Sequence, residues 1–547
     1  DKLVKYKILS RVFLNGVWME NLDWIVIFAY LLCMFSIALI TGRRQKSSSD
    51  YFLAGRSFSS GSLAASTLAT QCSTNSLLGA PAFVGFSLGG GLIWLQYELA
   101  VPIAMLILLY ILGPARRLGV TSIYEVVDRN IGRRSRLTAA GCFLFFRSVA
   151  TGVTVYGSSL ILSFLLGIDL FMAVFLIMGL TIFYDLLGGL AAIVASDILQ
   201  LFLLTTAIIF ALAILGDAID WDFFLTDRGE TLSNDWGFAG NDYGFWPMLF
   251  GGIFLYAAYY GCDQSQSQRI LASRSEEETK QILMFNGIFR FPLVLLYCFL
   301  GLGLASLAQI DREFILSLPL LVDGTPNYNL VFPVFVMNYF SPGFVGLVLV
   351  GLIAAAMSSI DSSINSLAAV TVEDFIKPNL NPSVTPETLL KYGRVCTFLW
   401  GCASVVFSFQ VPFIAPTVLE AVNKIGSMIN GPLLALICIA TLVGEVDEIS
   451  ALLGFWIGAL SNLALALFLP QVSWLWWNVS GFLTAVLVFL VISQARSMVV
   501  TFRVIGDAAK KTPTTRMYKN IFNQEYHFSL LSMFVIILVV CYCLNNY

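Results

Sequence analysis

The sequence predicts an all-α polytopic membrane protein, because of its composition, the spacing of its apolar runs and the placement of its basic residues. Of 547 residues, 58% are hydrophobic and only 12% are charged, whereas a soluble domain needs about 25% charged residues to cover its water-facing surface. A surface this poor in charge must face lipid, so the first predicted partner is the bilayer. The net charge of -3, without a basic field, argues against nucleic acid as a partner.

Apolar runs recur along the whole chain, and a membrane-spanning helix needs about 20 apolar residues. Fourteen candidate spans begin near Leu22, Ser60, Leu92, Leu137, Leu170, Ile198, Phe245, Ile282, Leu330, Thr397, Pro416, Ala451, Trp474 and Phe528. Turn residues or charges separate the runs, and the 43 glycines and 17 prolines suit packed membrane helices with breaks. We therefore expect one transmembrane domain over residues 1–547.

Basic residues set the expected orientation. They gather in the connections after spans 1, 3, 7, 9 and 13: Arg43, Arg44, Lys46, Arg56; Arg116, Arg117, Arg129, Arg133, Arg134, Arg136; Arg269, Arg274, Lys280; Lys377, Lys391, Arg394; and Arg496, Arg503, Lys510, Lys511, Arg516, Lys519. If the spans alternate in direction, all five basic connections lie on one side of the membrane, and the positive-inside rule makes that side cytoplasmic. The expected location is the plasma membrane. The acidic connection from Asp217 to Tyr243 is expected outside. The basic tail over residues 2–11 disagrees, because an even span count places it outside too.

Three basic residues belong to no connection, since Arg147, Arg290 and Lys424 fall inside apolar runs. A charge at the bilayer centre costs at least about 2.5–3.5 kcal/mol on insertion scales, so such residues face the bundle interior and are paired or functional. Acidic residues that could pair with them are Glu98, Asp185, Asp197, Asp361 and Glu420. These groups either form structural ion pairs or line a pathway for substrate and ions.

Two polar runs interrupt apolar spans. The first, Thr70–Ser76, is too polar for a lipid-facing helix and predicts a broken helix that lines a cavity, where free carbonyls can coordinate a cation. The second, Ser358–Ser363, lies in the ninth span, and helical spacing places Ala355, Ser358, Ser359 and Ser362 on neighbouring faces. Hydroxyl and carbonyl oxygens with few carboxylates suit sodium. The alternative is that these hydroxyls bond to carbonyls of their own helix.

Four motifs resemble those of the sodium:solute symporter family. They are D-Y-F-L-A-G-R-S at Asp50–Ser57, G-G-L-A-A-I-V-A-S-D-I-L-Q at Gly188–Gln200, D-Q-S-Q-S-Q-R at Asp263–Arg269 and A-A-A-M-S-S-I-D-S-S-I-N-S at Ala354–Ser366. The resemblance implies the leucine-transporter fold, with two inverted five-helix repeats at 60–216 and 245–444. An extra helix at 22–41 precedes the repeats, and further helices at 451–547 follow them.

The resemblance also implies which residues bind sodium and solute. The first sodium site matches Ala69, Cys72, Ala355, Ser358 and Ser359, and a possible second site matches Asp197, Ser358, Asp361 and Ser362. Asp361 departs from the family, which usually has Ser or Thr there. The solute positions match Gln71, Ser73, Ser76, Gln96, Tyr256, Tyr259, Arg290 and Lys424. Arg147 lies about one turn before the carboxylate-binding arginine of sialic acid members, so it does not inherit that role.

These observations predict a sodium-coupled symporter that imports a small organic solute by alternating access, with sodium as the co-transported ion. Arg290 replaces the family's membrane lysine, and a guanidinium keeps its charge and binds carboxylates in two-point fashion, which favours an anion or carboxylate. The string at Ile364–Pro378 resembles the monocarboxylate, multivitamin and iodide branch and agrees. The alternatives are a neutral sugar or polyol, or sialic acid. An enzyme is not predicted, because His527 is the single histidine. The sequence indicates no oligomeric state, and a monomer is compatible with it.

Overall fold

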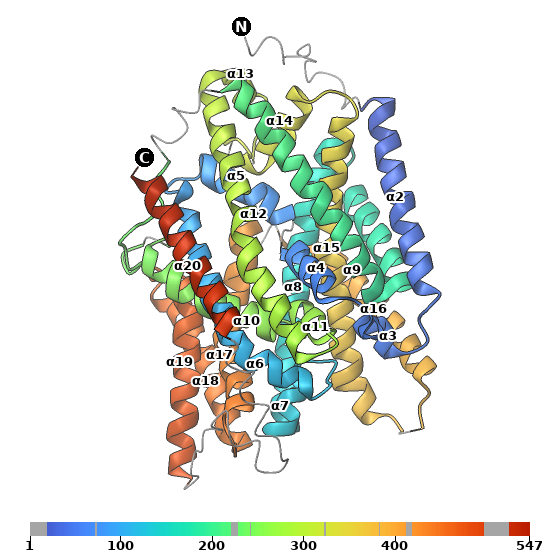
Figure 1. Ribbon diagram of the computed structural model, residues 1–547, viewed down its shortest axis with the longest axis vertical. Coiled ribbons are helices and arrows are strands. Elements are labelled where there is room, and N and C mark those ends of the chain that lie inside the picture. The colour runs from blue at the N-terminus through green and yellow to red at the C-terminus, as the bar shows by residue number, and fades with distance from the viewer. Residues whose placement is uncertain are drawn as a thin grey trace.

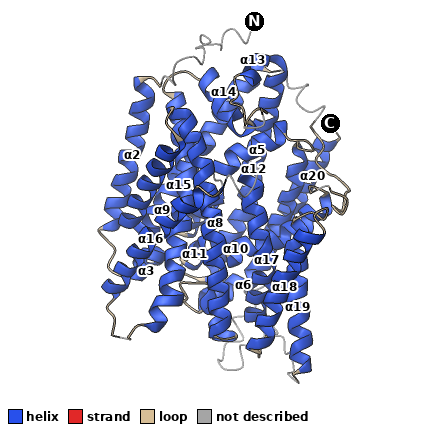
Figure 2. Cartoon of the chain, turned by 180° about the vertical axis from the view of Figure 1, so that it is seen from behind, coloured by secondary structure: helices blue, strands red, loops and turns tan. Residues whose placement is uncertain are grey.

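The computed structural model describes residues 19–71, 74–219, 228–240, 242–321, 324–381, 383–411, 418–496 and 524–546. Over these ranges the chain is helical and forms no strand (Figure 2). Nine of the described helices are long and apolar enough to cross a membrane, and the segments 76–86 and 426–442 are shorter apolar helices. The prediction of an all-helical protein with many apolar helices is therefore confirmed.

The longer helices in chain order are α2 (Asn21–Gly42), α4 (Ser60–Gln71), α5 (Thr74–Phe86), α6 (Ala100–Arg117), α8 (Arg133–Leu166), α9 (Leu170–Ala218), α10 (Gly252–Cys262), α11 (Gln264–Leu271), α12 (Glu276–Ile310), α14 (Val331–Tyr339), α15 (Phe344–Val370), α16 (Pro386–Ser408), α17 (Val418–Leu442), α18 (Glu448–Phe468), α19 (Leu475–Ala495) and α20 (Gln524–Asn545). Short helices include α3 (Ser48–Leu53), α7 (Tyr124–Asn130), α13 (Arg312–Leu316) and a 3₁₀ helix over Leu92–Leu99. Two π-helical segments are Pro247–Gly251 and Thr371–Ile376.

Helix α15 lies at the centre of the bundle, and α2 and α19 lie at opposite sides of it (Figure 1). α15 packs against α9, α8, α2 and α4 and is buried along nearly its whole length, both in its apolar parts and in its polar run Ser358–Ser363. α2 instead buries Asp23 and one apolar stripe, Ile27, Tyr30, Met34 and Ala38, and leaves its other residues partly or fully exposed. The three- and four-residue spacing of this stripe places one helix face on the bundle and leaves the others for lipid.

Helix α9 differs from the prediction of two spans that begin at Leu170 and Ile198. It continues from Leu170 to Ala218 and is interrupted at Gly189, whose φ is 51° and ψ is -157°. A Cβ atom at Gly189 would lie 2.7 Å from the carbonyl oxygen of Tyr51, so both the dihedral angle and the close contact require glycine. The second span therefore begins directly after Gly189, and this places Asp197 well inside it.

The ninth and tenth spans also begin elsewhere than predicted. The expected start at Leu330 was wrong, because α14 ends at Tyr339 and α15 begins only after Gly343, whose φ is 87°. The tenth span begins at Pro386 rather than near Thr397. Lys391 and Arg394 therefore lie in the early turns of α16 and not in the preceding connection. Both helix starts were misplaced because charged or turn residues next to an apolar run do not show by themselves whether they lie in the helix or in the preceding connection.

Asp23 of α2 fixes the start of α15. Its Oδ1 accepts hydrogen bonds from the backbone N–H groups of Gly343 and Gly346, each at 2.7 Å. The first backbone N–H groups of a helix have no partner within the helix, and a carboxylate there satisfies them and complements the helix dipole. The extra N-terminal helix is thereby tied to the central helix of the bundle.

The described parts of the five basic connections lie toward one end of the molecule, the lower end in Figure 1, where α7 lies. Three contacts join the first four connections: Arg56 to the Gly119 carbonyl at 3.0 Å, Arg116 to the Ser273 carbonyl at 2.6 Å and Arg133 to Asn379 at 2.8 Å. The start of α18 links the second and fifth connections, because the Arg134 N–H donates to Glu448 at 2.7 Å and Arg496 pairs with Asp447 at 3.2 Å. The basic residues at positions 2–11 and 503–519 lie outside the described ranges.

Candidate sodium and solute site

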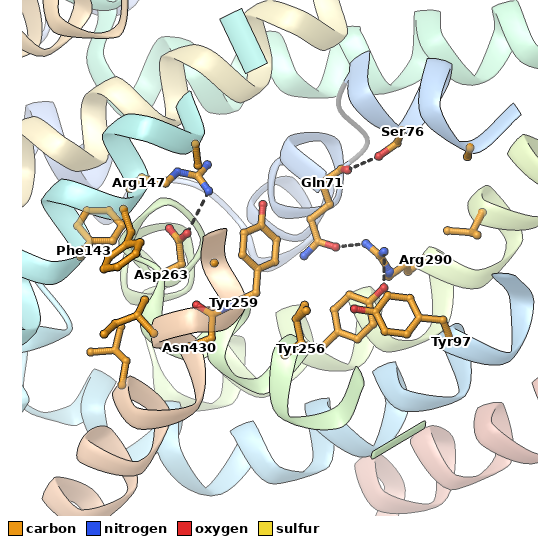
Figure 3. Close-up of a pocket in the computed structure, with 18 of the residues that line it drawn as sticks. Gln71, Ser76, Tyr97, Phe143, Arg147, Tyr256, Tyr259, Asp263, Arg290 and Asn430 are labelled. Atoms are coloured by element: carbon orange, nitrogen blue, oxygen red, sulfur yellow. Dashed lines mark hydrogen bonds and ion pairs between the residues drawn. The ribbon is translucent and has the colours of Figure 1, made fainter. Parts of the chain in front are cut away.

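A cavity of about 210 Å³ lies among α4, α5, α8, α10, α12 and α17. Aromatic side chains form much of its wall, including Trp94, Tyr97, Phe143, Tyr256 and Tyr259. Figure 3 shows two charged groups facing each other across it, with Tyr259 between them. Such a chamber, mostly apolar with a few convergent polar groups, is the usual form of a small-molecule site.

Arg290 of α12 forms the charged group on one side. Its Nε donates to Glu98 Oε2 at 2.9 Å, and its Nη2 donates to the Tyr256 hydroxyl at 2.8 Å. The guanidinium carbon also lies 4.7 Å from the centre of the Tyr256 ring, within the range of a cation–π contact. Glu98 is fully buried, whereas the Arg290 side chain is 14% exposed and lines the cavity. Arg290 is therefore both a structural ion-pair member and a group that a solute can reach.

Gln71, at the end of α4, brings a second polar group to Arg290. Its Oε1 accepts from Arg290 Nη1, and its backbone carbonyl accepts from the Ser76 hydroxyl at 3.1 Å. The amide nitrogen of Gln71 is buried without a hydrogen-bond partner among the described residues, although the side chain lines the cavity. A buried donor without a partner is costly, so this N–H group is available to an acceptor that enters the cavity.

Arg147 of α8 forms the charged group on the other side. Its Nη1 pairs with Asp263 Oδ2 at 3.0 Å, and its Nη2 donates to the Ser363 hydroxyl at 2.6 Å. Asp263 has extended dihedral angles between α10 and α11, and its Oδ1 accepts the N–H of Ser265 at 2.8 Å. One carboxylate therefore starts α11 and neutralises Arg147. In the sequence, Asp263 was recognised only as the first residue of a family motif, although an Asp followed by polar residues is a signal for a helix start.

The residues predicted for the first sodium site come from α4 and α15. Ala69, Ala355, Ser358 and Ser359 are buried, and Cys72 lies outside the described residues. The Ser359 hydroxyl lies 3.2 Å from the Thr70 carbonyl and 3.3 Å from the Ala355 carbonyl. The structure thus brings hydroxyl and carbonyl oxygens of both helices together. These are hard, uncharged ligands of the kind that sodium prefers.

The hydroxyls of α15 follow both of the interpretations left open by the sequence. The Ser363 hydroxyl bonds to the Ser359 carbonyl of its own helix at 2.7 Å. The Ser358 hydroxyl instead reaches Asp197 Oδ1 on α9 at 2.6 Å, and the Ser362 hydroxyl lies 3.3 Å from that of Thr70 on α4. The run is therefore more than a set of bonds within one helix, because it joins α15 to two neighbours.

The second predicted sodium site contains a residue that was expected in a loop. Arg269 lies on α11, and its side chain is 1% exposed. It pairs with Asp197 Oδ2 at 3.2 Å and donates to the Ser362 hydroxyl. The placement of Arg269 among the basic connections was therefore wrong. The D-Q-S-Q-S-Q-R segment is a buried helix rather than a surface loop.

Several solute positions are not brought to the cavity. Gln96 does not line it, because its amide is bonded to the Tyr243 carbonyl at 2.8 Å and to the Ser233 N–H at 3.1 Å. Lys424 is not among the described residues of the cavity wall, although Asn430, further along α17, is. Ser73 lies outside the described residues. The sequence did not single out Asn430, because an amide within an apolar helix gives no hint of the cavity it faces.

The comparisons with known proteins agree with this architecture. A family model described as "Sodium:solute symporter family" matches residues 51–458. The chain is similar to mouse sodium-coupled monocarboxylate transporter 1, with 31% identity over 448 residues that cover 80% of this chain and 71% of that protein. It is also similar to the sodium/sialic acid symporter NanT of Aliivibrio fischeri, with 28% identity over 442 residues that cover 79% of this chain and 85% of that protein.

Solved structures show the same fold. A sodium-coupled sialic acid symporter in a substrate-bound, outward-open state superposes with a TM-score of 0.76 at 24% identity, covering 88% of this chain and 99% of that one. A nucleobase-cation-symport-1 family transporter superposes with a TM-score of 0.51 at 15% identity, covering 86% of this chain and 97% of that one. With well over half of its length matched by the family model, this chain belongs to the sodium:solute symporter family.

Proposed function

We propose that this protein couples the uptake of a small carboxylate to sodium by alternating access, and that the carboxylate binds in the cavity beside Arg290. The observation that carries the proposal is that two donors lie at the same wall: the Arg290 guanidinium, and the Gln71 amide nitrogen, which has no hydrogen-bond partner among the described residues. A carboxylate has two acceptor oxygens and can accept from both donors at once. The similar proteins include transporters named for monocarboxylates and for sialic acid.

The size of the cavity supports a small solute. At about 210 Å³ it is below the range of about 300–1,000 Å³ found for drug-sized ligands. Aromatic rings make up much of the wall, so the solute carries an apolar part beside its carboxylate. Sialic acid is the second candidate, because Arg147 supplies another guanidinium on the opposite wall, although it is paired with Asp263.

Uptake into proteoliposomes with a sodium gradient tests the solute class. Arg290→Gln should lower uptake of a monocarboxylate at least tenfold, since a charge-assisted hydrogen bond contributes about 1.5–3 kcal/mol, and should affect a neutral sugar much less. Arg117→Gln is the matched control, because Arg117 pairs with Glu276 at 2.9 Å outside the cavity. Equal loss for charged and neutral solutes would remove Arg290 from solute recognition.

We propose sodium binding at Ala69, Cys72, Ala355, Ser358 and Ser359. The support is that Ser359 lies within hydrogen-bond distance of carbonyls from both helices. Ser359→Ala should raise the sodium concentration needed for half-maximal uptake about tenfold or more. Ser404→Ala is the control, because that buried serine on α16 bonds only to the Trp400 carbonyl of its own helix among the described residues. Sodium activation that is the same in both variants would argue against the site.

The full topology is part of the same proposal. It comprises fourteen spans, with inverted repeats at 60–216 and 245–444 between the extra helices at 22–41 and 451–547, and the basic end in the cytoplasm of a plasma membrane. The contacts among the described parts of the basic connections support this orientation. A cysteine at Lys391 should be inaccessible to an impermeant maleimide in intact cells, and one at Leu316, on α13 at the opposite end (Figure 1), should react. The reverse labelling would invert the topology.

A further inference from the structure

We propose that Arg147 is a positioning residue that links the first sodium site to the wall of the solute cavity. Its guanidinium contacts Ser363 of α15 on one side and Asp263, at the junction of α10 and α11, on the other. These two contacts form the link, and Figure 3 shows the second of them beside Tyr259. The inference rests on the sodium site proposed above, and it explains why a charge lies at this depth in the bundle.

On the side of the sodium site, the link consists of one hydroxyl group. Arg147 Nε and Nη2 donate to the Ser363 hydroxyl at 3.1 and 2.6 Å, and this hydroxyl donates to the Ser359 carbonyl at 2.7 Å. A serine hydroxyl has one donor and two acceptor positions, so these three hydrogen bonds occupy it completely. Ser359 also supplies the hydroxyl that lies near the carbonyls of Thr70 and Ala355. A shift of Ser359 on sodium binding therefore moves the Ser363 hydroxyl and the guanidinium with it.

On the side of the cavity, the link ends at the Asp263 carboxylate. Its Oδ2 pairs with Arg147 Nη1 at 3.0 Å, and its Oδ1 accepts the N–H of Ser265 at the start of α11. Asp263 also ends α10, one turn after Tyr259, whose hydroxyl accepts from Gln266 Nε2 of α11 at 3.2 Å. Asp263 has extended dihedral angles between the two helices, so a change in its position alters the angle between them. The cavity wall that carries Tyr259 then moves.

The pair of Arg147 and Asp263 differs from an ion pair buried deep in the bundle. The two side chains are 13% and 17% exposed and both line the cavity, whereas Asp374, which pairs with Arg136, is fully buried. Water in the cavity can solvate both charges when they separate, so this pair costs less to rearrange than a dry one. The contact can therefore change between two conformations, as a link between two binding sites requires.

This arrangement predicts that sodium alters the cavity wall even when no solute is present. Sodium favours the conformation to which it binds more tightly, and the link transmits that preference to Asp263. By reciprocity, a solute in the cavity then changes the sodium affinity by the same factor. Loss of Arg147 should uncouple the two sites without abolishing either of them. A purely structural ion pair would instead affect the stability of the protein and leave its response to sodium unchanged.

Labelling of a cysteine in the cavity wall tests the proposal with sodium alone as the probe. Leu255 lies on α10 one turn before Tyr259 and lines the cavity, so Leu255→Cys reports on this wall. Its modification by a small thiol reagent is followed by peptide mass spectrometry, in sodium and with potassium in its place. Binding of radioactive sodium is measured on the same purified protein. We expect sodium to change the labelling rate about fivefold or more, the lower limit of typical coupling between two sites.

Two further substitutions, each added to Leu255→Cys, break the link. Arg147→Gln and Ser363→Ala should each remove most of the sodium effect on the labelling rate, while sodium still binds. Ser366→Ala is the matched control and should keep the full effect. Ser366 is also a buried serine in the same part of α15, and its hydroxyl bonds only to the Ser363 carbonyl of its own helix among the described residues.

The possible outcomes separate the link from the sodium site. A sodium effect that persists in both Arg147→Gln and Ser363→Ala would overturn the proposal, as would bound sodium that leaves the labelling rate of the Leu255→Cys protein unchanged. No bound sodium in the Leu255→Cys protein would contradict the proposed sodium site itself. If Arg147→Gln does not fold, Ser363→Ala decides, because it removes only the hydroxyl group between the guanidinium and Ser359.

Discussion

The ion pair between Arg290 and Glu98 predicts an asymmetric response to the loss of either partner. Glu98 is 0% exposed, and the Arg290 side chain is 14% exposed at the cavity wall. Arg290→Gln leaves a buried carboxylate whose remaining hydrogen-bond partner among the described residues is the Tyr256 hydroxyl at 3.2 Å, and breaking a buried pair in this way costs about 3–5 kcal/mol. Glu98→Gln leaves a guanidinium that water in the cavity can reach, so the expected cost is about 1.5–3 kcal/mol.

The double variant Glu98→Gln, Arg290→Gln should be more stable than Arg290→Gln alone, because no uncompensated charge remains. Unfolding of the four proteins in detergent measures the coupling energy as a double-mutant cycle. Arg117 and Glu276 form a matched control pair at the same 2.9 Å separation, with side chains 38% and 21% exposed, and should give a coupling of at most about 1 kcal/mol. Additive effects at Arg290 and Glu98, or a greater loss from Glu98→Gln, would refute the reasoning.

Two further predictions concern the helix starts and breaks. Gly189→Ala should lower the melting temperature, because the positive φ and the contact with the Tyr51 carbonyl strain any side chain at a cost of about 1–3 kcal/mol. Gly179→Ala in the same helix, where a Cβ meets no atom within 4 Å, should be neutral or stabilising, and similar effects of both changes would contradict the role of Gly189. Asp23→Ala should lower the melting temperature by removing two charged hydrogen bonds to α15, each worth about 1.5–3 kcal/mol. The melting temperature of Asp23→Asn should lie between those of the wild type and Asp23→Ala. An unchanged melting temperature for Asp23→Ala would disprove the capping.

Much of the fold could be predicted from composition and apolar spacing, because lipid exposure requires long apolar helices. The errors occurred where a tertiary contact decides the boundary. Gly189 interrupts a helix because the Tyr51 carbonyl approaches it, and α15 begins at Phe344 because Asp23, far away in the sequence, caps it. Neither partner can be recognised from the local pattern.

The candidate site, too, could be predicted only in part from local sequence. Charges at membrane depth pointed to Arg147 and Arg290, since their cost in lipid demands a partner or a function. Arg269 was placed in a connection, because a polar segment between apolar runs is usually a loop. The structure instead buries that segment as α11. Hydropathy alone cannot distinguish a polar helix inside a bundle from a loop outside it.

The number of sodium ions that bind beside the oxygen-rich segment of α15 has an electrical consequence. If one sodium ion accompanies one monovalent carboxylate, no net charge crosses the membrane, and the membrane potential neither drives nor opposes uptake. Accumulation then follows the sodium ratio alone, about tenfold for a tenfold gradient. With a second ion, each 100 mV would add about 2.3 kcal/mol, or roughly fifty-fold. The number of sodium ions bound beside α15 would thus decide whether this carrier responds to voltage or only to salt.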